Sequence, residues 1–459
     1  MQRSSSRRLC ARTLARVIAS SSVLLGALGA GCSSDGSDGD DTPAPPTGAG
    51  GGEIVDEEAT LARLELSESS LWGSDDLPVK QLGSVQFVGD TAIVSGTPRE
   101  NDVEASIVMA VDARTGEERW RADTGRPLDG GGVGAVLWQI TSSPVVVGDE
   151  RDGVVLVEYR TQYAVEGCSR CPRNRTDAEG IAALSIEDGS VVWLRPVIPS
   201  VSVDDRRATP YALQTPRRLV ANDQVAMLEV LVRRGDGFDN RVAAFDPTTG
   251  ERLWQLRDVE VAFAVDDVVL GVEQRDPRGS KLQRAGITVA FDARTGARRW
   301  TLGSRDSLTS PMVAVPGVAA VRTTAEGRTL QLVDLNDGSV LSDLPPTVTC
   351  RSDGESVIAC IGGGIYDPRL TTYDATTATL ATSAQEVPSD VLAAVADGYV
   401  YVGNEFSPAE ERVALDRSAN VLSEPLPGVV VRATEQYLVL DEHEPGSTPG
   451  SFAAYEIVS

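Results

Sequence analysis

Short apolar runs recur along the chain, and each leads into a polar turn. The best copy reads Val-Met-Ala-Val-Asp112-Ala-Arg-Thr-Gly116-Glu-Glu-Arg-Trp120, with a tryptophan four residues after the glycine. Aspartate opens such a turn because its carboxylate accepts amide hydrogen bonds, and glycine closes it because it adopts positive φ angles. The pattern therefore predicts antiparallel strands joined by a tight Asp-x-x-Thr-Gly turn.

Eight copies of this unit follow one another. Three more keep the full register: Ser185, Gly189 and Trp193; Asp246, Gly250 and Trp254; and Asp292, Gly296 and Trp300. Degenerate copies follow at Asp334 with Gly338, and at Asp374, Asp416 and Glu456. The later copies are spaced by about 40 to 46 residues, which is close to the length of one four-stranded propeller blade. The repeat predicts an all-β, eight-bladed β-propeller of four-stranded antiparallel blades, with the tryptophans packed between neighbouring blades.

The two ends of the chain are predicted to close this ring. The chain stops soon after the eighth turn position, so its last blade lacks an outer strand. The segment from Ala62 to Ser67, which leads to Trp72, alternates between apolar and polar residues and is placed to supply that strand. Pairing of the termini removes the open sheet edges that favour aggregation.

The repeat Ala-x-Asp-x-x-Thr-Gly-x-x-x-Trp resembles that of the pyrroloquinoline-quinone-like (PQQ-like) β-propellers over about 400 residues. This family contains quinoprotein dehydrogenases as well as cofactor-free propellers, such as the BamB-like lipoprotein of the outer-membrane barrel assembly machine. The resemblance implies the fold. It does not separate a binding scaffold from an oxidoreductase, because one fold serves many functions.

The N-terminal region predicts export and a lipid anchor. Five arginines precede an apolar stretch in residues 1–31, and the sequence ending at Cys32 resembles a bacterial lipobox. We expect a lipoprotein signal peptide at 1–31 and lipid attachment at Cys32, the alternative being a stray thiol beside an ordinary cleavage site. Residues 32–58 are rich in Asp, Gly and Pro and predict a flexible linker. The propeller is expected at 59–459, outside the cytoplasm and anchored to the outer membrane or cell surface.

Charge and cysteine usage agree with an exported protein. The net charge of −25 argues against nucleic acid as a partner, since an acidic surface repels phosphates. Cys350 and Cys360 flank a hairpin turn symmetrically, which predicts a cross-strand disulfide. Cys168 and Cys171 form a C-x-x-C motif, which suits a redox site, half a zinc site or a local disulfide clamp. The chain has one histidine, so we favour the clamp and expect no metal site.

Catalytic motifs are missing from the sequence. His443, the only histidine, lies in a polar loop without a Gly-x-Ser-x-Gly elbow, and Gly130–Gly134 precedes a strand-like segment rather than a helix. No two cysteines are adjacent, unlike the pair that holds the quinone in alcohol dehydrogenases of this family. We therefore expect neither PQQ nor calcium, no catalytic residue, and a monomeric scaffold that binds envelope or surface proteins. The alternatives are a PQQ-dependent or other sugar or alcohol oxidoreductase, and a ligand-sensing surface propeller.

The connections between the second and third strands of the blades vary most in length, above all residues 161–180 and 274–286. All of them are expected at the end of the ring opposite the Asp-x-x-Thr-Gly turns. Loops held by a rigid scaffold commonly carry recognition, so this end is predicted to bind the partner.

Overall fold

The chain divides into two units, Met1–Glu58 and Ala59–Ser459. The computed structural model describes only residues of the second unit: 61–99, 106–123, 135–137, 143–163, 175–198, 214–234, 237–273, 286–304, 308–323, 329–345, 347–364, 367–404, 407–442 and 451–458. The predicted signal peptide, Cys32 and the linker lie outside these residues, as do Cys168, Cys171 and His443. Within the described ranges, no helix is long and apolar enough to cross a membrane.

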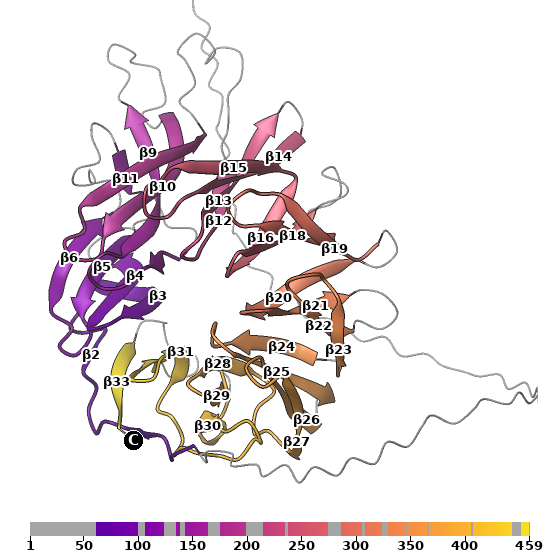
Figure 1. The fold of residues 1–459 in the computed structure, drawn as a ribbon. Coiled ribbons are helices and arrows are strands. Elements are labelled where there is room, and N and C mark those ends of the chain that lie inside the picture. Colours follow the sequence, from indigo (N-terminus) through magenta and orange to yellow (C-terminus); the bar gives the residue numbers. More distant parts are fainter. Residues whose placement is uncertain are drawn as a thin grey trace, which may run out of the picture. The chain divides into compact units, whose positions relative to one another are not determined.

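Eight antiparallel sheets form a ring around a central axis, which confirms the predicted β-propeller (Figure 1). The first strand of each blade lines the centre and contacts the first strand of the next blade, from β3 round to β31 and back to β3. Apolar clusters fill the spaces between neighbouring sheets. Because each sheet has apolar residues on both faces, neighbouring blades bury surface that one sheet cannot bury alone.

Blades 1 to 4 follow the chain order. Their strands are β3 (Val79–Val88), β4 (Thr91–Pro98), β5 (Ile107–Asp112) and β6 (Glu118–Asp123); β7 (Ala135–Leu137), β8 (Val145–Val147), β9 (Val154–Tyr163), β10 (Arg175–Ser185) and β11 (Val191–Ile198); β12 (Gln214–Ala221), β13 (Ala226–Arg234), β14 (Gly237–Phe245) and β15 (Arg252–Arg257); and β16 (Val259–Val265), β17 (Val268–Glu273), β18 (Ile287–Asp292) and β19 (Arg298–Leu302). In blade 2, both β7 and β8 pair with β9.

Blades 5 to 8 complete the ring. Their strands are β20 (Thr309–Val315), β21 (Val318–Thr323), β22 (Leu330–Asp334) and β23 (Val340–Leu344); β24 (Thr347–Ser352), β25 (Val357–Gly364), β26 (Asp367–Asp374) and β27 (Thr379–Glu386); β28 (Leu392–Ala396), β29 (Tyr399–Val402) and β30 (Val413–Leu415), with the short 3-10 helix η2 (Ala409–Glu411); and β31 (Val429–Ala433), β32 (Tyr437–Asp441) and β33 (Phe452–Val458). Blade 7 has three strands, and a single bridge from Leu415 to Val421 stands in place of its fourth.

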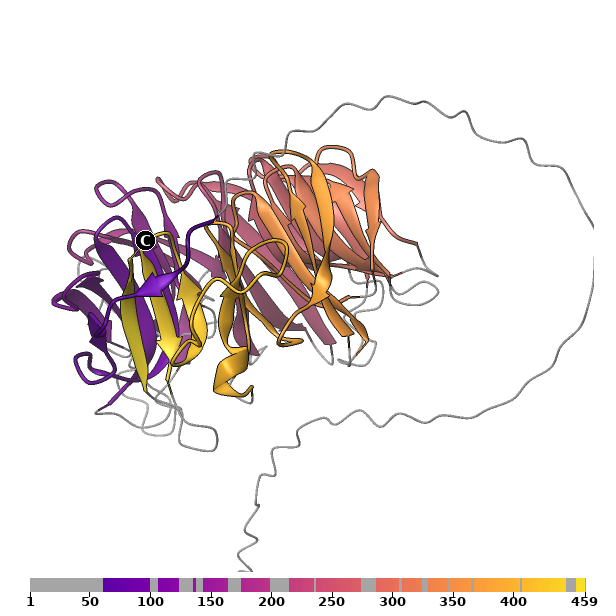
Figure 2. The same cartoon turned by 90° about the horizontal axis from the view of Figure 1, so that it is seen from below.

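The N-terminal segment closes the ring, as predicted. Strand β1 (Glu65–Leu66) and strand β2 (Trp72–Gly73) both pair with β33. Figure 2 shows this segment, in indigo, lying across the yellow C-terminal strands. Glu456, which we expected to open an eighth turn, lies instead inside β33. The reason is that β33 runs on to pair with β1 rather than turning back into a strand of its own.

The repeated turns have the expected chemistry. Asp112 Oδ1 accepts hydrogen bonds from the amides of Arg114 and Thr115, each at 3.0 Å. The Gly116 amide donates to the Asp112 carbonyl. The hairpin between the first and second strands turns at the same end of the ring, and the two turns are joined, for example from the Ala113 amide to the Asp90 carbonyl. We call this end the turn end.

The glycines that close these turns occupy the left-handed region, where a side chain is strained. The φ angles are 71° at Gly116, 72° at Gly189, 65° at Gly250 and 67° at Gly296. The turn of Gly189 is opened by Ser185 instead of an aspartate. Its hydroxyl oxygen accepts the amides two and three residues further on, at 3.2 and 3.4 Å. The glycine is thus retained where the aspartate is replaced.

Tryptophans connect five of the blade boundaries. Each indole N–H donates to a carbonyl in the turn of the next blade, and each ring covers that turn's glycine. The pairs are Trp72 to Ala113, Trp120 to Ile186, Trp193 to Pro247, Trp254 to Ala293 and Trp300 to Leu335, at 2.7 to 3.0 Å. Trp72 lies in the closing segment, so the ring closure repeats the chemistry of an ordinary boundary. We call these five the tryptophan boundaries.

The three remaining boundaries, from blade 5 to blade 8, have no tryptophan in their described residues. Ser342 of blade 5 pairs opposite Leu332 as Trp254 pairs opposite Ala244, and in blade 6 this place is taken by Ala381, opposite Thr372. Between blades 6 and 7, Arg417 bonds the Asp374 carboxylate. Between blades 7 and 8, Leu61 and Leu64 of the N-terminal segment pack into the apolar cluster. We call these the open boundaries.

Candidate functional site

A cavity of about 620 Å³ opens at the turn end of the ring. Its walls come mainly from the first hairpins of four neighbouring blades: Phe87 and Gly89 of blade 1, Asp353, Glu355 and Ser356 of blade 6, Ala396–Gly398 of blade 7 and Arg432–Tyr437 of blade 8. Arg417 of blade 7 completes the lining. The cavity therefore lies beside the two open boundaries that flank blade 7 and beside the ring closure.

None of the repeat residues predicted from the sequence lines this cavity. Gly189 lies under the Trp120 ring between blades 1 and 2, where an added Cβ would approach the ring to 2.7 Å. Gly296 lies in the same way under the Trp254 ring between blades 3 and 4, also at 2.7 Å. These two glycines, like Gly116 and Gly250, are packing positions of the frame and not parts of a binding site.

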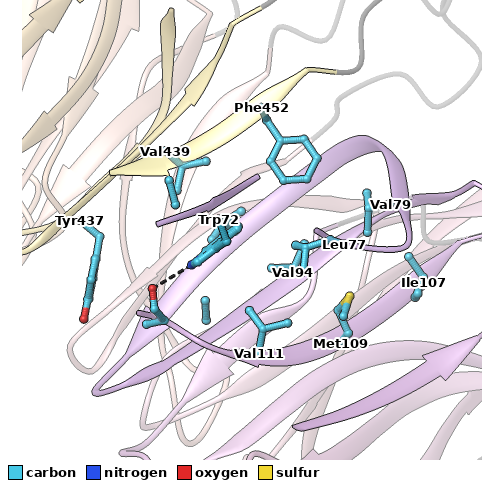
Figure 3. Packing of buried hydrophobic residues seen from close by; sticks show 14 residues of the cluster. Trp72, Leu77, Val79, Val94, Ile107, Met109, Val111, Tyr437, Val439 and Phe452 are labelled. Carbon is cyan, nitrogen blue, oxygen red and sulfur yellow. Dashed lines mark hydrogen bonds between the residues drawn. The ribbon is translucent and has the colours of Figure 1, made fainter. Parts of the chain in front are cut away.

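An aromatic pair forms the wall at the ring closure. The rings of Phe87 and Tyr437 stack with centroids 4.9 Å apart and planes 16° apart. Figure 3 shows Tyr437 in the same packed layer as Trp72, Val439 and Phe452, which joins the first and last blades. This side of the cavity is therefore rigid, because its aromatic pair rests on the buried core that holds the ring closed.

One carboxylate at the cavity serves the backbone. Asp353 Oδ1 accepts hydrogen bonds from the amides of Glu355, Ser356 and Val357, at 2.8 to 2.9 Å. Such an arrangement shapes the hairpin turn, since the side chain replaces missing backbone acceptors. Asp353 is thus committed to structure and has little capacity left for a ligand.

Three other carboxylates are exposed at the hairpin tips. Glu355, Asp397 and Glu435 belong to the turns of blades 6, 7 and 8, and each side chain faces solvent. Asp397 has a φ of 47° and precedes Gly398 at 79°, which is the geometry of a two-residue Asp-Gly hairpin. Across the described part of the chain, none of the three has a hydrogen bond or ion pair through its side chain. Their charge is available to a partner.

The two arginines at the cavity differ in their surroundings. Arg417 bonds Asp374 of the neighbouring blade. Burial raises the pKa of Asp374, but hydrogen bonds from Thr376, Arg417 and the turn amides outweigh it and bring the pKa to about 2. Arg417 is therefore a structural cation that ties blade 7 to blade 6.

Arg432 has no such partner in the described ranges. A β-bulge in β31 inserts Val431 between the pairs Val430–Leu440 and Arg432–Val439, and bulges commonly redirect side chains. The Arg432 side chain reaches solvent through the cavity. The protein around it nevertheless removes part of its hydration, and this desolvation lowers the pKa of the guanidinium. The cavity thus contains an uncompensated guanidinium below a rim of carboxylates.

A smaller hollow of about 290 Å³ between blades 1 and 2 provides a contrast. Two of its charged groups, Arg119 and Glu150, are 3.0 Å apart, and Arg119 also contacts Asp112 at 3.1 Å. A hydrogen bond from Thr91 and one from Arg119 lower the pKa of Glu150. These groups are consumed by internal pairing, so the larger cavity is the better candidate for binding.

The chemistry of the larger cavity favours binding. It offers carboxylates, a guanidinium and a stacked aromatic wall, a set that pairs with charged and apolar groups of a ligand. Over the parts of the chain that the structure describes, no group of three or more His, Cys, Asp and Glu side chains is placed to hold a metal ion.

The structure contains the predicted disulfide, because Cys350 and Cys360 lie directly opposite in β24 and β25 and are bonded. It joins two strands inside blade 6, away from the cavity.

Comparison with known proteins identifies the repeat family. The model of the family described as outer membrane protein assembly factor BamB matches residues 104–339 and 239–422, which together are more than half of the chain. The chain belongs to this family of PQQ-like repeat β-propellers. No curated protein matches it.

Three solved structures resemble the chain at low sequence identity. BamB from Moraxella catarrhalis is 17% identical, with 86% of this chain and 98% of that chain covered and a TM-score of 0.43. Quinohemoprotein alcohol dehydrogenase from Comamonas testosteroni is 14% identical, with 87% and 77% covered and a TM-score of 0.44. A europium-containing methanol dehydrogenase is 12% identical, with 87% and 94% covered and a TM-score of 0.44.

The sequence signals thus located the framework and missed the cavity. The repeat residues hold blades together, whereas the cavity residues occupy hairpin tips that differ from blade to blade. One signal was present: Arg432 departs from the small residue at the corresponding place of blade 7, Ala394. Without the fold, nothing places that departure beside a cavity.

Proposed function

We propose that this chain is an exported, lipid-anchored scaffold that binds proteins of the cell envelope during their assembly and does not itself catalyse a reaction. The observation that carries the proposal is the family match across most of the propeller to outer membrane protein assembly factor BamB. The lipoprotein-like N-terminus agrees with that role. A tethered, rigid ring presents binding surfaces at a membrane without needing a reactive centre.

The packing of the ring limits where a partner binds. The sheet faces are consumed between blades, so partners reach mainly the two ends of the ring and the outer strands. At the end opposite the turns, long connections join β9, which ends at Tyr163, to β10, which begins at Arg175, and β17, which ends at Glu273, to β18, which begins at Ile287. At the turn end lies the charged cavity. Both ends combine a rigid frame with variable residues, as protein recognition requires.

A membrane-capture experiment tests the proposal. The tagged chain is expressed in its own host, crosslinked in intact cells and purified from membranes, and the captured proteins are identified by mass spectrometry. We expect a small set of envelope proteins, lost when connections 164–174 and 274–285 are replaced by short turns in a variant with unchanged thermal unfolding. Capture that survives both replacements removes the loops from the binding surface.

Two further measurements bear on the rest of the proposal. A Cys32→Ala variant is expected to be lost from the membrane fraction and to appear in the soluble extracytoplasmic fraction; retention in the membrane contradicts the lipid anchor.

The purified chain is mixed with PQQ and calcium and then passed through gel filtration. We expect no bound chromophore and no dye-linked alcohol oxidation. Stable quinone binding with turnover overturns the non-catalytic part of the proposal.

A further inference from the structure

The cavity at the turn end contains charges that the fold does not use. Asp353 serves its own turn and Arg417 serves Asp374, whereas Glu355, Asp397, Glu435 and Arg432 bond nothing among the described residues. An unpaired charge costs free energy where water is partly excluded, as it is around Arg432. Because Arg432 lines a formed cavity of about 620 Å³, we expect a ligand to pair with it, and the exposed carboxylates at the hairpin tips are accessible to the same ligand.

A second arginine shows what a purely structural residue does at the same place. Arg351 in β24 pairs opposite Ala359, and Arg432 in β31 pairs opposite Val439, which are corresponding positions of blades 6 and 8. Arg351 donates hydrogen bonds to the carbonyls of Ala393 and Cys350, at 3.4 and 3.3 Å. It does not line the cavity. Arg432 lines the cavity and donates no such bond among the described residues, so its position alone does not explain its role.

Blade 7 places a small residue between these two arginines. Ala394 occupies the corresponding position of β28, opposite Tyr401, and β28 contacts both β24 and β31. Ala394 has no polar side-chain group that could bond Arg432, whose exposed side chain lines the cavity. The unpaired cation is therefore an anion-accepting point on the wall.

The charges are arranged in two levels. Arg432 lies on the strand, while Glu435 lies at the tip of the same hairpin, and Asp397 and Glu355 lie at the tips of the neighbouring hairpins. A polyanion such as nucleic acid is repelled by this rim. A ligand that satisfies both levels carries positive groups outside and one negative group inside, a combination that peptides provide.

We propose that the cavity binds a basic peptide segment of a partner protein, with a carboxylate of the segment on Arg432 and its Lys or Arg side chains on Glu355, Asp397 and Glu435. This rests on the proposed role as a protein-binding scaffold and assigns a ligand chemistry to one of its surfaces. The apolar parts of the segment lie against the half-buried ring of Phe87, which the buried Tyr437 supports from behind. The carboxylate is either the C-terminal group or an acidic side chain.

Calorimetric titration of the mature chain with three short peptides tests the proposal. The probes are N-acetyl-Lys-Lys-Ala-Ala with a free carboxyl end, the same peptide as an amide, and N-acetyl-Lys-Lys-Ala-Glu as an amide. The free acid is expected to bind about tenfold more tightly than the first amide, a typical effect of one charge-assisted pair. If the carboxylate is a side chain, the glutamate peptide binds best. Equal binding of all three, or no binding at millimolar concentration, overturns the proposal.

Matched variants locate the effect. Arg432→Gln is expected to weaken the preferred peptide about tenfold and to abolish the preference for a carboxylate, with partial rescue by Arg432→Lys. Arg351→Gln, at the corresponding position outside the cavity, is expected to change neither. Glu435→Gln combined with Asp397→Asn is expected to weaken acid and amide peptides alike and to reduce the salt dependence, whereas the exposed Glu251→Gln on blade 3 does neither. Equal losses for Arg351→Gln and Arg432→Gln contradict the site.

The outcome separates this inference from the proposed function. Failure of peptide binding with envelope capture intact removes the cavity as a site and leaves the scaffold standing. If the unmodified chain neither captures envelope proteins nor binds the peptides, both the proposed function and the cavity site are refuted.

Discussion

The two halves of the ring are held together in different ways. From blade 8 through the closure to blade 5, a tryptophan at each boundary covers the next blade's glycine and bonds its turn. From blade 5 to blade 8, the three open boundaries are held instead by apolar clusters, the Arg417–Asp374 pair and the N-terminal segment. The cavity lies in the second half and at its junction with the first. Uniform packing thus forms the frame, and the less uniform half carries the unpaired charges.

The two halves of the ring also differ in the residues on the outer strands of their blades. At the second position after the turn glycine, blades 1, 3 and 4 carry Glu118, Arg252 and Arg298, and blade 2 carries the half-buried Val191. The corresponding places of blades 5, 6 and 7 carry exposed Val340, Leu380 and Val421. Charges on edge strands discourage unwanted pairing with other chains. At this position, the half with open boundaries therefore lacks the charges that blades 1, 3 and 4 carry on their outer strands.

The largest predicted effect comes from removing a boundary tryptophan. Trp193→Ala is expected to lower the free energy of unfolding by about 3–5 kcal/mol, since a buried indole leaves a cavity and the Pro247 carbonyl loses its donor. Ser342→Ala, at the corresponding place of blade 5, is expected to cost below about 1 kcal/mol. Urea unfolding of both variants measures the contrast. Similar losses contradict a difference between the halves.

A glycine substitution sharpens the same comparison. Gly250→Ala is expected to cost about 3 kcal/mol or more, because its φ of 65° is strained for alanine and the new Cβ meets Trp193 at 2.6 Å. Gly354→Ala in blade 6 has a φ of 86° and nothing within 4 Å, so it is expected to cost about 1–2 kcal/mol from backbone strain alone. Thermal unfolding distinguishes the two. Equal losses of stability in the two variants would mean that backbone strain accounts for the whole effect and that the contact with Trp193 contributes nothing.

The ion pair of the open half predicts a pH dependence. The pKa of Asp374 is about 2 in the folded chain, below its ordinary value, so the carboxylate stabilises the fold above about pH 4 and loses that contribution as the pH falls toward 2. Asp374→Asn is expected to lower stability at pH 7 by about 1–2 kcal/mol, discounted for the solvent around Arg417, and to flatten the acid limb. Unfolding curves from pH 7 to pH 2 measure this. An unchanged acid limb contradicts the assignment.

The smallest effect is expected at the exposed rim. Replacing Val340, which is 45% exposed, by arginine imitates the edges of blades 3 and 4. We expect a change in stability within about 0.5 kcal/mol and less self-association at high protein concentration. Light scattering measures the second effect. A loss above about 1 kcal/mol shows that this rim is packed rather than free.

The sequence alone determined the repeat, the turn chemistry, the closure of the ring and the Cys350–Cys360 pairing. These depend on contacts between residues close in the chain or on a period that recurs, and both are visible in the order of residues. The tryptophan four residues after Gly250 and the alternation of Ala62–Ser67 are local signals of this kind. The eighth turn at Glu456 was wrong because pairing with a distant segment replaced a local turn.

Only the tertiary structure decided which residues share the cavity and which charges stay unpaired. Phe87, Asp397 and Arg432 come from three blades and meet because the ring brings the first hairpin of blade 1 beside those of blades 7 and 8. No local pattern specifies such meetings. The contrast between Arg351 and Arg432 also depends on the fold, because Arg351 finds the carbonyl of Ala393 on the neighbouring strand, whereas Arg432 lines the cavity without a bond among the described residues. The sequence specifies the charge of a side chain, but the tertiary structure decides which groups lie close enough to pair with it.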